Sequence, residues 1–224
     1  KDFAFVKKND PFIEKKLKSK KFDSKIIKVN TIKNHNFLKK IKNDYFFSDS
    51  NKENLSFVIE ISKKLKLNKS LFIITIQKFK GLKYRQQIIY KNPFLTIIND
   101  SKSTTFSSSE SVLKKNSNIY WLLGGIPKKG DRLNLNKKHH SKIKAFIYGK
   151  NKKFFNNQLK DKIQYSNFNN LSDALKKIFT IINKDNFLKK TIIFSPSAAS
   201  FDSFINFEDR GQYFNKLIKE YLNG

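Results

Sequence analysis

Residues 119–125 read IYWLLGG, a run of apolar side chains that two glycines end. Comparable apolar runs occupy residues 94–98, 143–148 and 191–194, and stretches with helical spacing lie near 106–116, 151–159, 171–183 and 203–222. Apolar strands that alternate with amphipathic helices are typical of a parallel sheet covered by helices on both faces. The sequence therefore predicts a doubly wound, mostly parallel α/β domain of Rossmann-like type over residues 93–224.

The first part of the chain has a less regular pattern. Through residue 50, short apolar pieces stand among lysines without a convincing period, so irregular strands and loops are expected. From Asn54 the apolar residues follow a helical spacing, and a second helix is expected over 71–79, ended by Gly81. A short strand at 87–90 precedes the turn-forming pair Asn92-Pro93, which we take as the boundary between domains at 1–92 and 93–224.

Composition limits the class of protein. The chain has 224 residues, 38% of them hydrophobic, so it can bury a core, and its lack of cysteine excludes disulfides, thiolate zinc sites and cysteine nucleophiles. No apolar run could span a bilayer and no signal-peptide core opens the sequence, which predicts a cytoplasmic location without membrane contact. Because the sequence begins at Lys1 and contains no methionine, we expect a fragment of a longer protein.

The net charge of +29 would ordinarily suggest a nucleic-acid partner. However, arginine occurs only at positions 85, 132 and 210, and the lysines are spread along the whole chain beside Asn, Ile and Phe. Proteins that read nucleic acid usually concentrate arginine. We attribute the charge to an AT-rich genome and expect no nucleic acid, while a basic, non-enzymatic polyanion-binding domain remains the alternative from another functional class.

Three ends of predicted strands carry polar residues. Doubly wound sheets bind ligands at the carboxyl ends of their strands, where loops lead into helices. The loops are residues 99–104 (NDSKST), 124–131 (GGIPKKGD) and 195–202 (SPSAASFD). Ser200 is expected to cap the final helix, whose free amides would suit a carboxylate. Each loop alone could be a simple cap, turn or surface ion pair, but their convergence at one edge would favour a binding site.

Other common sites lack support. No Gly-x-x-x-x-Gly-Lys-Ser/Thr loop occurs, so the chain has no recognisable P-loop for a triphosphate. The three histidines, His35, His139 and His140, lack metal-ligand spacing, and no serine stands in a Gly-x-Ser-x-Gly elbow.

In this order, the three loops resemble motifs of the Mur ligases, the amide ligases of peptidoglycan synthesis, in the branch that adds D-glutamate to UDP-N-acetylmuramoyl-L-alanine. Residues 194–204 with 206–211 resemble the C-terminal signature of that branch, and residues 98–104 and 122–125 with Lys128 resemble two further motifs. Residues 79–85 (FKGLKYR) resemble the motif that closes the central ATPase domain, and 51–54 resemble the start of the preceding helix pair.

This resemblance implies that residues 1–92 are the tail of an α/β central ATPase domain and that 93–224 form the amino-acid-binding domain. It implies an ADP-forming reaction in which ATP phosphorylates the carboxylate of the nucleotide substrate and D-glutamate attacks the acyl phosphate, with Mg²⁺ present. The UDP-binding domain, the P-loop and most metal ligands would precede Lys1. The chain alone is therefore expected to be inactive, and a monomer is expected.

The resemblance also implies roles for individual residues. ATP would be contacted by Arg85, Asp100 and Lys102. The residues that would hold D-glutamate are Thr104, Lys128, Ser200, the amide of Phe201 and the ring of Phe207, with Lys128 as the catalytic residue and no metal ligand among them. The assignment suits the acceptor, because Lys128 and a helix N-terminus would oppose its two carboxylates.

The chain departs from the family at two positions. Tyr84 and Ser50 stand where the family usually has histidine, and His35-Asn36 does not restore the second, which leaves the adenine contacts open. The nearest alternative is another ligase of the Mur and folylpolyglutamate synthetase superfamily. The Asp-Asn-Pro-Arg tetrapeptide of the diaminopimelate-adding relatives does not occur.

Overall fold

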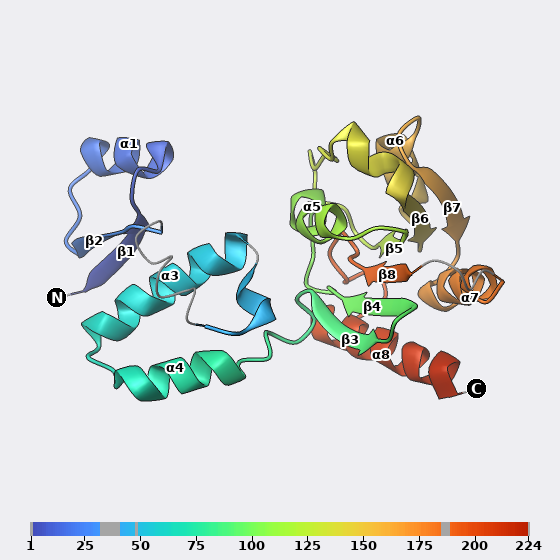
Figure 1. The fold of residues 1–224 in the computed structure, drawn as a ribbon. Helices are drawn as coiled ribbons and strands as arrows, with labels where there is room; N and C mark the ends of the chain where they lie inside the picture. The colour runs from blue at the N-terminus through green and yellow to red at the C-terminus, as the bar shows by residue number, and fades with distance from the viewer. Residues whose placement is uncertain (1, 32–40, 48, 185–188, 224) are drawn as a thin grey trace. The chain divides into compact units, whose positions relative to one another are not determined.

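The computed structural model describes residues 2–31, 41–47, 49–184 and 189–223, so His35 and Asn36 lie outside it, as does the side chain of Ser50. The chain forms two compact units, Lys1–Gly81 and Leu82–Gly224 (Figure 1). Among the helices of the described ranges, none is long and apolar enough to cross a bilayer.

The second unit is built on a six-stranded sheet. Its strands, in spatial order, are β3 (Gln87–Lys91), β4 (Leu95–Asn99), β8 (Lys190–Phe194), β5 (Ile119–Gly124), β6 (Ile143–Tyr148) and β7 (Gln164–Phe168). Only the pairing of β3 with β4 is antiparallel, and the other four pairings are parallel. The predicted mostly parallel α/β sheet is confirmed.

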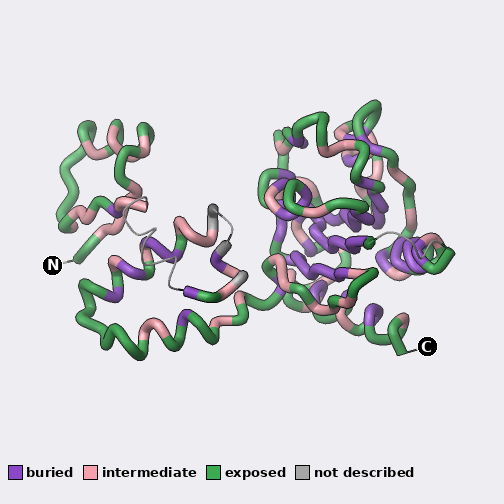
Figure 2. The backbone as a smooth tube through the Cα atoms, viewed as in Figure 1, coloured by how far each residue is buried: buried purple, intermediate pink, exposed green. Residues whose placement is uncertain are grey.

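Helices cover both faces of this sheet. The helices α5 (Phe106–Lys115) and α6 (Lys152–Leu159) pack on one face, and α7 (Leu171–Ile182) and α8 (Phe207–Asn223) pack on the other (Figure 1). Along β5, Trp121 belongs to the first apolar core and Leu122 to the second, because successive side chains of a strand point to opposite faces. The central strands are consequently buried along their whole length (Figure 2).

Two features of the second unit differ from the sequence prediction. Strand β7 was not expected, because its sequence QYSNF lies at the sheet edge and leaves most side chains exposed or half-buried rather than forming an apolar run. Helix α8 begins at Phe207, later than predicted, since the side chain of Asn206 accepts a 2.7 Å hydrogen bond from the amide of Asp209. The prediction that Ser200 caps this helix is therefore wrong.

The first unit opens with a parallel strand pair, where irregular strands and loops had been predicted. Strands β1 (Phe3–Lys7) and β2 (Lys25–Val29) pair in parallel and are joined by helix α1 (Pro11–Ser19). The start of α1 follows familiar rules, because Asp10 accepts hydrogen bonds from the amides of Phe12 and Ile13 and Pro11 occupies the first turn. The strands are short and mostly half-exposed, so they leave no regular apolar pattern.

A helix pair completes the first unit, as predicted. A short 3-10 helix, η1 (Asp44–Phe47), precedes α3 (Asp49–Lys64) and α4 (Lys69–Lys78), and all three contribute to one small apolar core. Gly81 does not end α4, which stops at Lys78. Instead Gly81, at φ +85°, lies so near Tyr45 that a Cβ atom would approach the ring within 2.6 Å.

The division between the units falls at Gly81 and Leu82, before the junction expected at Asn92-Pro93. Strand β3 explains the difference, since its antiparallel pairing with β4 makes residues 87–91 part of the second sheet. The remaining element, the 3-10 helix η2 (Lys137–Lys142), leads into β6.

Adjacent phenylalanines on α6 provide a test of this packing. Phe155 is fully buried against Phe106, whereas Phe154 is only partly buried against the same cluster. Phe155→Ala should lower the free energy of unfolding by about 3–5 kcal/mol and Phe154→Ala by about 1–2 kcal/mol. Urea denaturation of both variants measures the difference, and equal losses would contradict the packing of α6 described above.

Candidate functional site

The carboxyl ends of the central strands bring the three predicted loops to one edge of the sheet. Strands β4, β8 and β5 are neighbours and parallel, so the loops that follow them leave from the same side. Ile126 and Ala199 join the second and third loops through two backbone hydrogen bonds of 2.9 Å, and the amide of Gly124 donates to the carbonyl of Pro196 at 3.1 Å. The second and third loops are therefore joined directly to each other.

A buried arginine fastens the first loop to the third. Arg210 on α8 is 1% exposed, and its Nε and Nη2 donate to the hydroxyl and carbonyl oxygens of Ser101 at 3.1 and 2.7 Å. Nη1 and Nη2 both donate to the carbonyl of Ala198 at 3.0 Å. Burial lowers the pKa of Arg210, while nearby Tyr148 and Asp202 favour its charged form. Because a buried guanidinium requires such partners, Arg210 holds both loops in place.

Gly125 lets the second loop approach this arrangement. Its φ is +125°, and a Cβ atom there would lie 2.3 Å from the carbonyl oxygen of Ala199 and 3.2 Å from Nη1 of Arg210. A larger residue would therefore push apart the Ile126–Ala199 bridge. This is the physical reason for a glycine directly after β5.

A fourth loop, after β6, also reaches this edge, although it was not among the predicted loops. Nδ2 of Asn151 donates to the carbonyl of Gly125 at 2.9 Å, and a Cβ atom on Gly149 would lie 3.5 Å from Oδ2 of Asp202. Burial raises the pKa of Asp202, while Arg210 and Lys150 act against the rise. The rule that pointed to the other loops could have found this one, because residues 149–151 follow a predicted strand.

Asp100 lies inside the site rather than on its surface. It is 4% exposed, its Oδ2 accepts from the hydroxyl of Ser195 at 2.7 Å, and its Oδ1 accepts from the amide of Gln86 at 3.0 Å. Burial raises the pKa of Asp100 to about 6, although these hydrogen bonds and the charge of Arg85 oppose the rise. Both oxygens of this predicted ATP ligand are thus engaged within the second unit.

Buried serines continue from Asp100 into the domain. The hydroxyl of Ser195 lies 2.7 Å from that of Ser109, which is 2.6 Å from the hydroxyls of both Ser197 and Ser103. All four serines are buried. The network links the first loop, helix α5 and the third loop, and explains why small hydroxyl residues are frequent in these segments.

The other predicted residues are placed differently. Ser200 is buried and Phe207 half-buried, while Arg85, Lys102, Thr104, Lys128 and Phe201 are exposed, Phe201 to 71%. The ammonium group of Lys102 lies 4.1 Å from the centre of the Phe207 ring, which joins a predicted ATP ligand to a predicted D-glutamate ligand. Lys128 lies two residues beyond Ile126, whose partner Ala199 precedes Ser200.

Tyr84, which departs from the family pattern, is buried beside α8. Its ring lies against Gly211, where a Cβ atom would come within 2.4 Å of Cδ1, and its carbonyl accepts from the amide of Lys102 at 3.0 Å. Tyr84 thus has a packing role in the second unit. The presence of Gly211 in the signature NFEDRG follows from this close approach.

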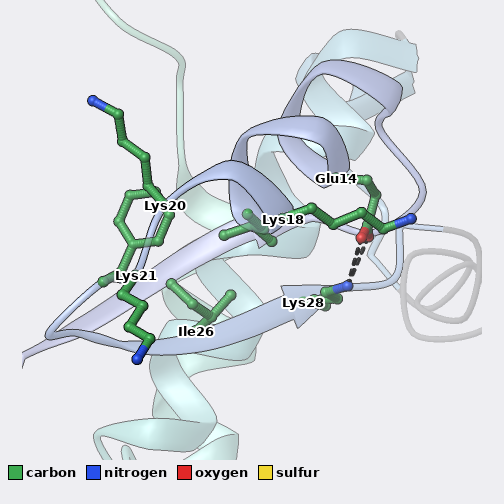
Figure 3. A pocket seen from close by; sticks show the side chains of 8 residues that line it. Glu14, Lys18, Lys20, Lys21, Ile26 and Lys28 are labelled. Atoms are coloured by element: carbon green, nitrogen blue, oxygen red, sulfur yellow. Dashed lines mark hydrogen bonds and ion pairs between the residues drawn. The ribbon is translucent and has the colours of Figure 1, made fainter.

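The first unit contains a separate hollow of about 590 Å³ between α1 and β2 (Figure 3). Lys28 at its rim is paired with Glu14 at 2.7 Å, and the ammonium groups of Lys20 and Lys21 point away from the cavity in different directions. It holds none of the predicted site residues. In the described ranges, no three His, Asp or Glu side chains gather as metal ligands.

Solved structures show which proteins share this fold. MurF from Acinetobacter baumannii matches with a TM-score of 0.63 at 13% identity, over 99% of this chain and 52% of that one. A folylpolyglutamate synthase/dihydrofolate synthase from Yersinia pestis, complexed with AMPPNP and a manganese ion, matches with a TM-score of 0.51 at 11% identity, over 75% of this chain and 38% of that one. The fold is that of the Mur and folylpolyglutamate synthase ligases.

Sequence relatives identify the family to which the chain belongs. No family model matches the chain. The UDP-N-acetylmuramoylalanine--D-glutamate ligase of Wolbachia sp. subsp. Brugia malayi is 36% identical over 76% of this chain, and that of Rickettsia bellii is 34% identical over 84%. The chain belongs to the Mur ligase family, as its motifs indicated. It spans 34% and 43%, respectively, of the length of these two relatives.

Two glycines with positive φ allow the loop junction to be tested. Gly130→Ala places a Cβ atom in open space and should cost only the left-handed backbone, about 1 kcal/mol. Gly125→Ala should cost at least about 2 kcal/mol more, because the Cβ atom overlaps the carbonyl of Ala199. Thermal and urea unfolding compare the two, and similar losses would show that the junction tolerates a side chain.

Asp100 predicts a pH dependence of stability. Since its folded pKa of about 6 exceeds the unfolded value, the native state binds its proton more tightly, and stability falls as pH rises from about 4 to 6. In Asp100→Asn, the decrease in the free energy of unfolding over this pH range should be smaller than in wild type, by at most about 3 kcal/mol. Urea unfolding from pH 4 to 7, with exposed Asp161→Asn as control, measures it. A constant difference between wild type and Asp100→Asn would refute the shifted pKa.

Proposed function

We propose that this chain provides the amino-acid-binding domain, and the end of the ATPase domain, of a ligase that adds D-glutamate to UDP-N-acetylmuramoyl-L-alanine. The observation that carries the proposal is the meeting of three motif-bearing loops at one edge of the sheet, fastened by Arg210 and the Ile126–Ala199 bridge. The relatives named as D-glutamate ligases support the same substrate.

D-glutamate suits this edge chemically. It carries two carboxylates, and the exposed Lys128 with the amide of Phe201 offers one cation and one backbone donor. Thr104 and Ser200 supply hydroxyl groups, and the ring of Phe207 borders the site. We assign Lys128 the role of holding the acceptor so that its amine can attack an acyl phosphate, which lowers the barrier mainly through position and charge.

ATP would be met by residues of the first loop and of the segment that precedes β3. Arg85 and Lys102 are exposed cations of a kind that suits phosphate oxygens, whereas Asp100 would reach the ribose only through the oxygens that already accept hydrogen bonds. ATP supplies the phosphoryl group that activates the carboxylate. In the described ranges no three His, Asp or Glu side chains gather as metal ligands, and the family resemblance places most Mg²⁺ ligands in another part of the enzyme.

Titration with D-glutamate tests the proposal, because Lys128 and Lys129 are adjacent exposed lysines of which only the first is assigned to the site. We expect saturable shifts in the NMR signals of residues 126–128 and 199–201 on adding D-glutamate. Lys128→Ala should weaken binding roughly tenfold and Lys129→Ala less than twofold, since a charge-assisted hydrogen bond is lost in the first alone. Equal binding of L-glutamate, or equal effects of both variants, would contradict it.

Two further measurements concern activity and the alternative class. The chain alone should release no ADP from ATP in the presence of both substrates, because it contains no P-loop.

Binding to duplex DNA should be weak at physiological salt. Tight binding with a steep dependence on salt would instead favour a polyanion-binding domain.

A further inference from the structure

The backbone on both sides of Arg85 is strained. Tyr84 and Gln86 adopt φ values of +59° and +48°, in the left-handed region that residues other than glycine seldom occupy. Such conformations persist only where the surrounding structure fixes them, and they concentrate at functional sites. The contacts of both residues show how the surrounding structure holds this conformation.

Tyr84 is held by three contacts. Its amide donates to Oε1 of Gln87 at 3.1 Å, and its carbonyl accepts from the amide of Lys102 at 3.0 Å. Its buried ring fills the space that Gly211 leaves open on α8. The residue before Arg85 is thus fixed to the first loop and to α8.

Gln86 is held by two contacts of a different kind. Its amide donates to Oδ1 of Asp100 at 3.0 Å, and Nε2 of its side chain donates to the hydroxyl of Ser111 at 2.6 Å. Asp100 belongs to the first loop and Ser111 to α5, both in the second unit. The residue after Arg85 is therefore fixed to the body of the same domain.

Arg85 differs from its neighbours, because its side chain is exposed while theirs are buried or half-buried. We propose that Tyr84 and Gln86 are positioning residues, which fix the strained backbone so that the guanidinium of Arg85 is presented at the carboxyl edge for an anionic phosphate chain. The inference rests on the proposed role of Arg85 toward ATP and extends it. It makes Ser111 and Gly211 part of the support of a phosphate-binding residue.

Cleavage after Arg85 by an arginine-specific protease, in the whole 224-residue chain, tests the positioning. The protease acts on locally opened segments, so its rate follows the population in which the segment is released. Gln86→Ala and Ser111→Ala each remove the 2.6 Å hydrogen bond and should speed this cleavage roughly fivefold. Ser111→Thr keeps a hydroxyl and should stay within twofold of wild type, as should Gln164→Ala on the exposed edge strand. Cleavage after exposed Arg132 in the same digests is the internal reference, because none of these variants touches that segment.

The NMR signal of the Arg85 Nε–H group gives a readout that lost stability alone would not move. We expect a distinct position in wild type and in Ser111→Thr, and a shift toward that of Arg132 in Gln86→Ala and Ser111→Ala. Unchanged cleavage and an unchanged Nε signal in both alanine variants would overturn the positioning role.

Addition of ATP separates this inference from the proposed function. ATP should shift the Arg85 signal in wild type, with roughly fivefold weaker apparent affinity in Ser111→Ala. Suppose that ATP leaves the Arg85 signal of wild type unchanged while the alanine variants are cleaved faster and Ser111→Thr is cleaved like wild type. That outcome refutes the ATP role of Arg85 and upholds the positioning of its backbone.

Discussion

The guanidinium of Arg210 is the constraint on which the candidate site depends. A charged group that is 1% exposed must find hydrogen-bond acceptors inside the protein, and here they are oxygens of Ser101 and Ala198 on two different loops. If either loop moved away, part of the charge would be left buried without partners, at high cost in free energy. The loops after β4 and β8 are therefore coupled to each other through one side chain.

Five of the six residues of the surrounding signature NFEDRG have identifiable structural contacts. Asn206 caps α8, the carbonyl of Phe207 accepts from the hydroxyl of Ser101 at 2.8 Å, and Asp209 accepts from the amide of Ile205 at 3.2 Å. Arg210 then reaches the loops, and Gly211 leaves room for Tyr84. This short motif therefore contains the residues that contact three other segments from one turn of the helix.

The sequence predicted the central sheet well, because strands buried on both faces must be mostly apolar, and β4, β5, β6 and β8 meet that condition at most of their positions. The edge position of the loops followed from a general rule of doubly wound sheets. By contrast, β7 and the β1–α1–β2 unit are partly exposed, so their side chains carry no regular apolar pattern.

The placement of individual side chains was harder to predict. In the sequence, Asp100 has the features of a surface ligand. In the structure it is buried and accepts hydrogen bonds from Gln86 and Ser195, neither of which is close to it in the sequence. The roles of Lys128, Thr104 and Ser200 came from a resemblance rather than from spacing. The structural role of Arg210 could not be predicted from its place in the motif, since its partners lie on loops that folding brings together.

The position of β8 has a consequence for biosynthesis. This strand is near the end of the chain, yet it lies between β4 and β5, pairing Leu95 with Lys190 and Ile119 with Thr191. Contacts so distant along the chain form late, and while the ribosome has not yet released residues 190–194, the open edges of β4 and β5 can pair with another polypeptide. A nascent domain of this kind should therefore depend on chaperones until its last strand has inserted.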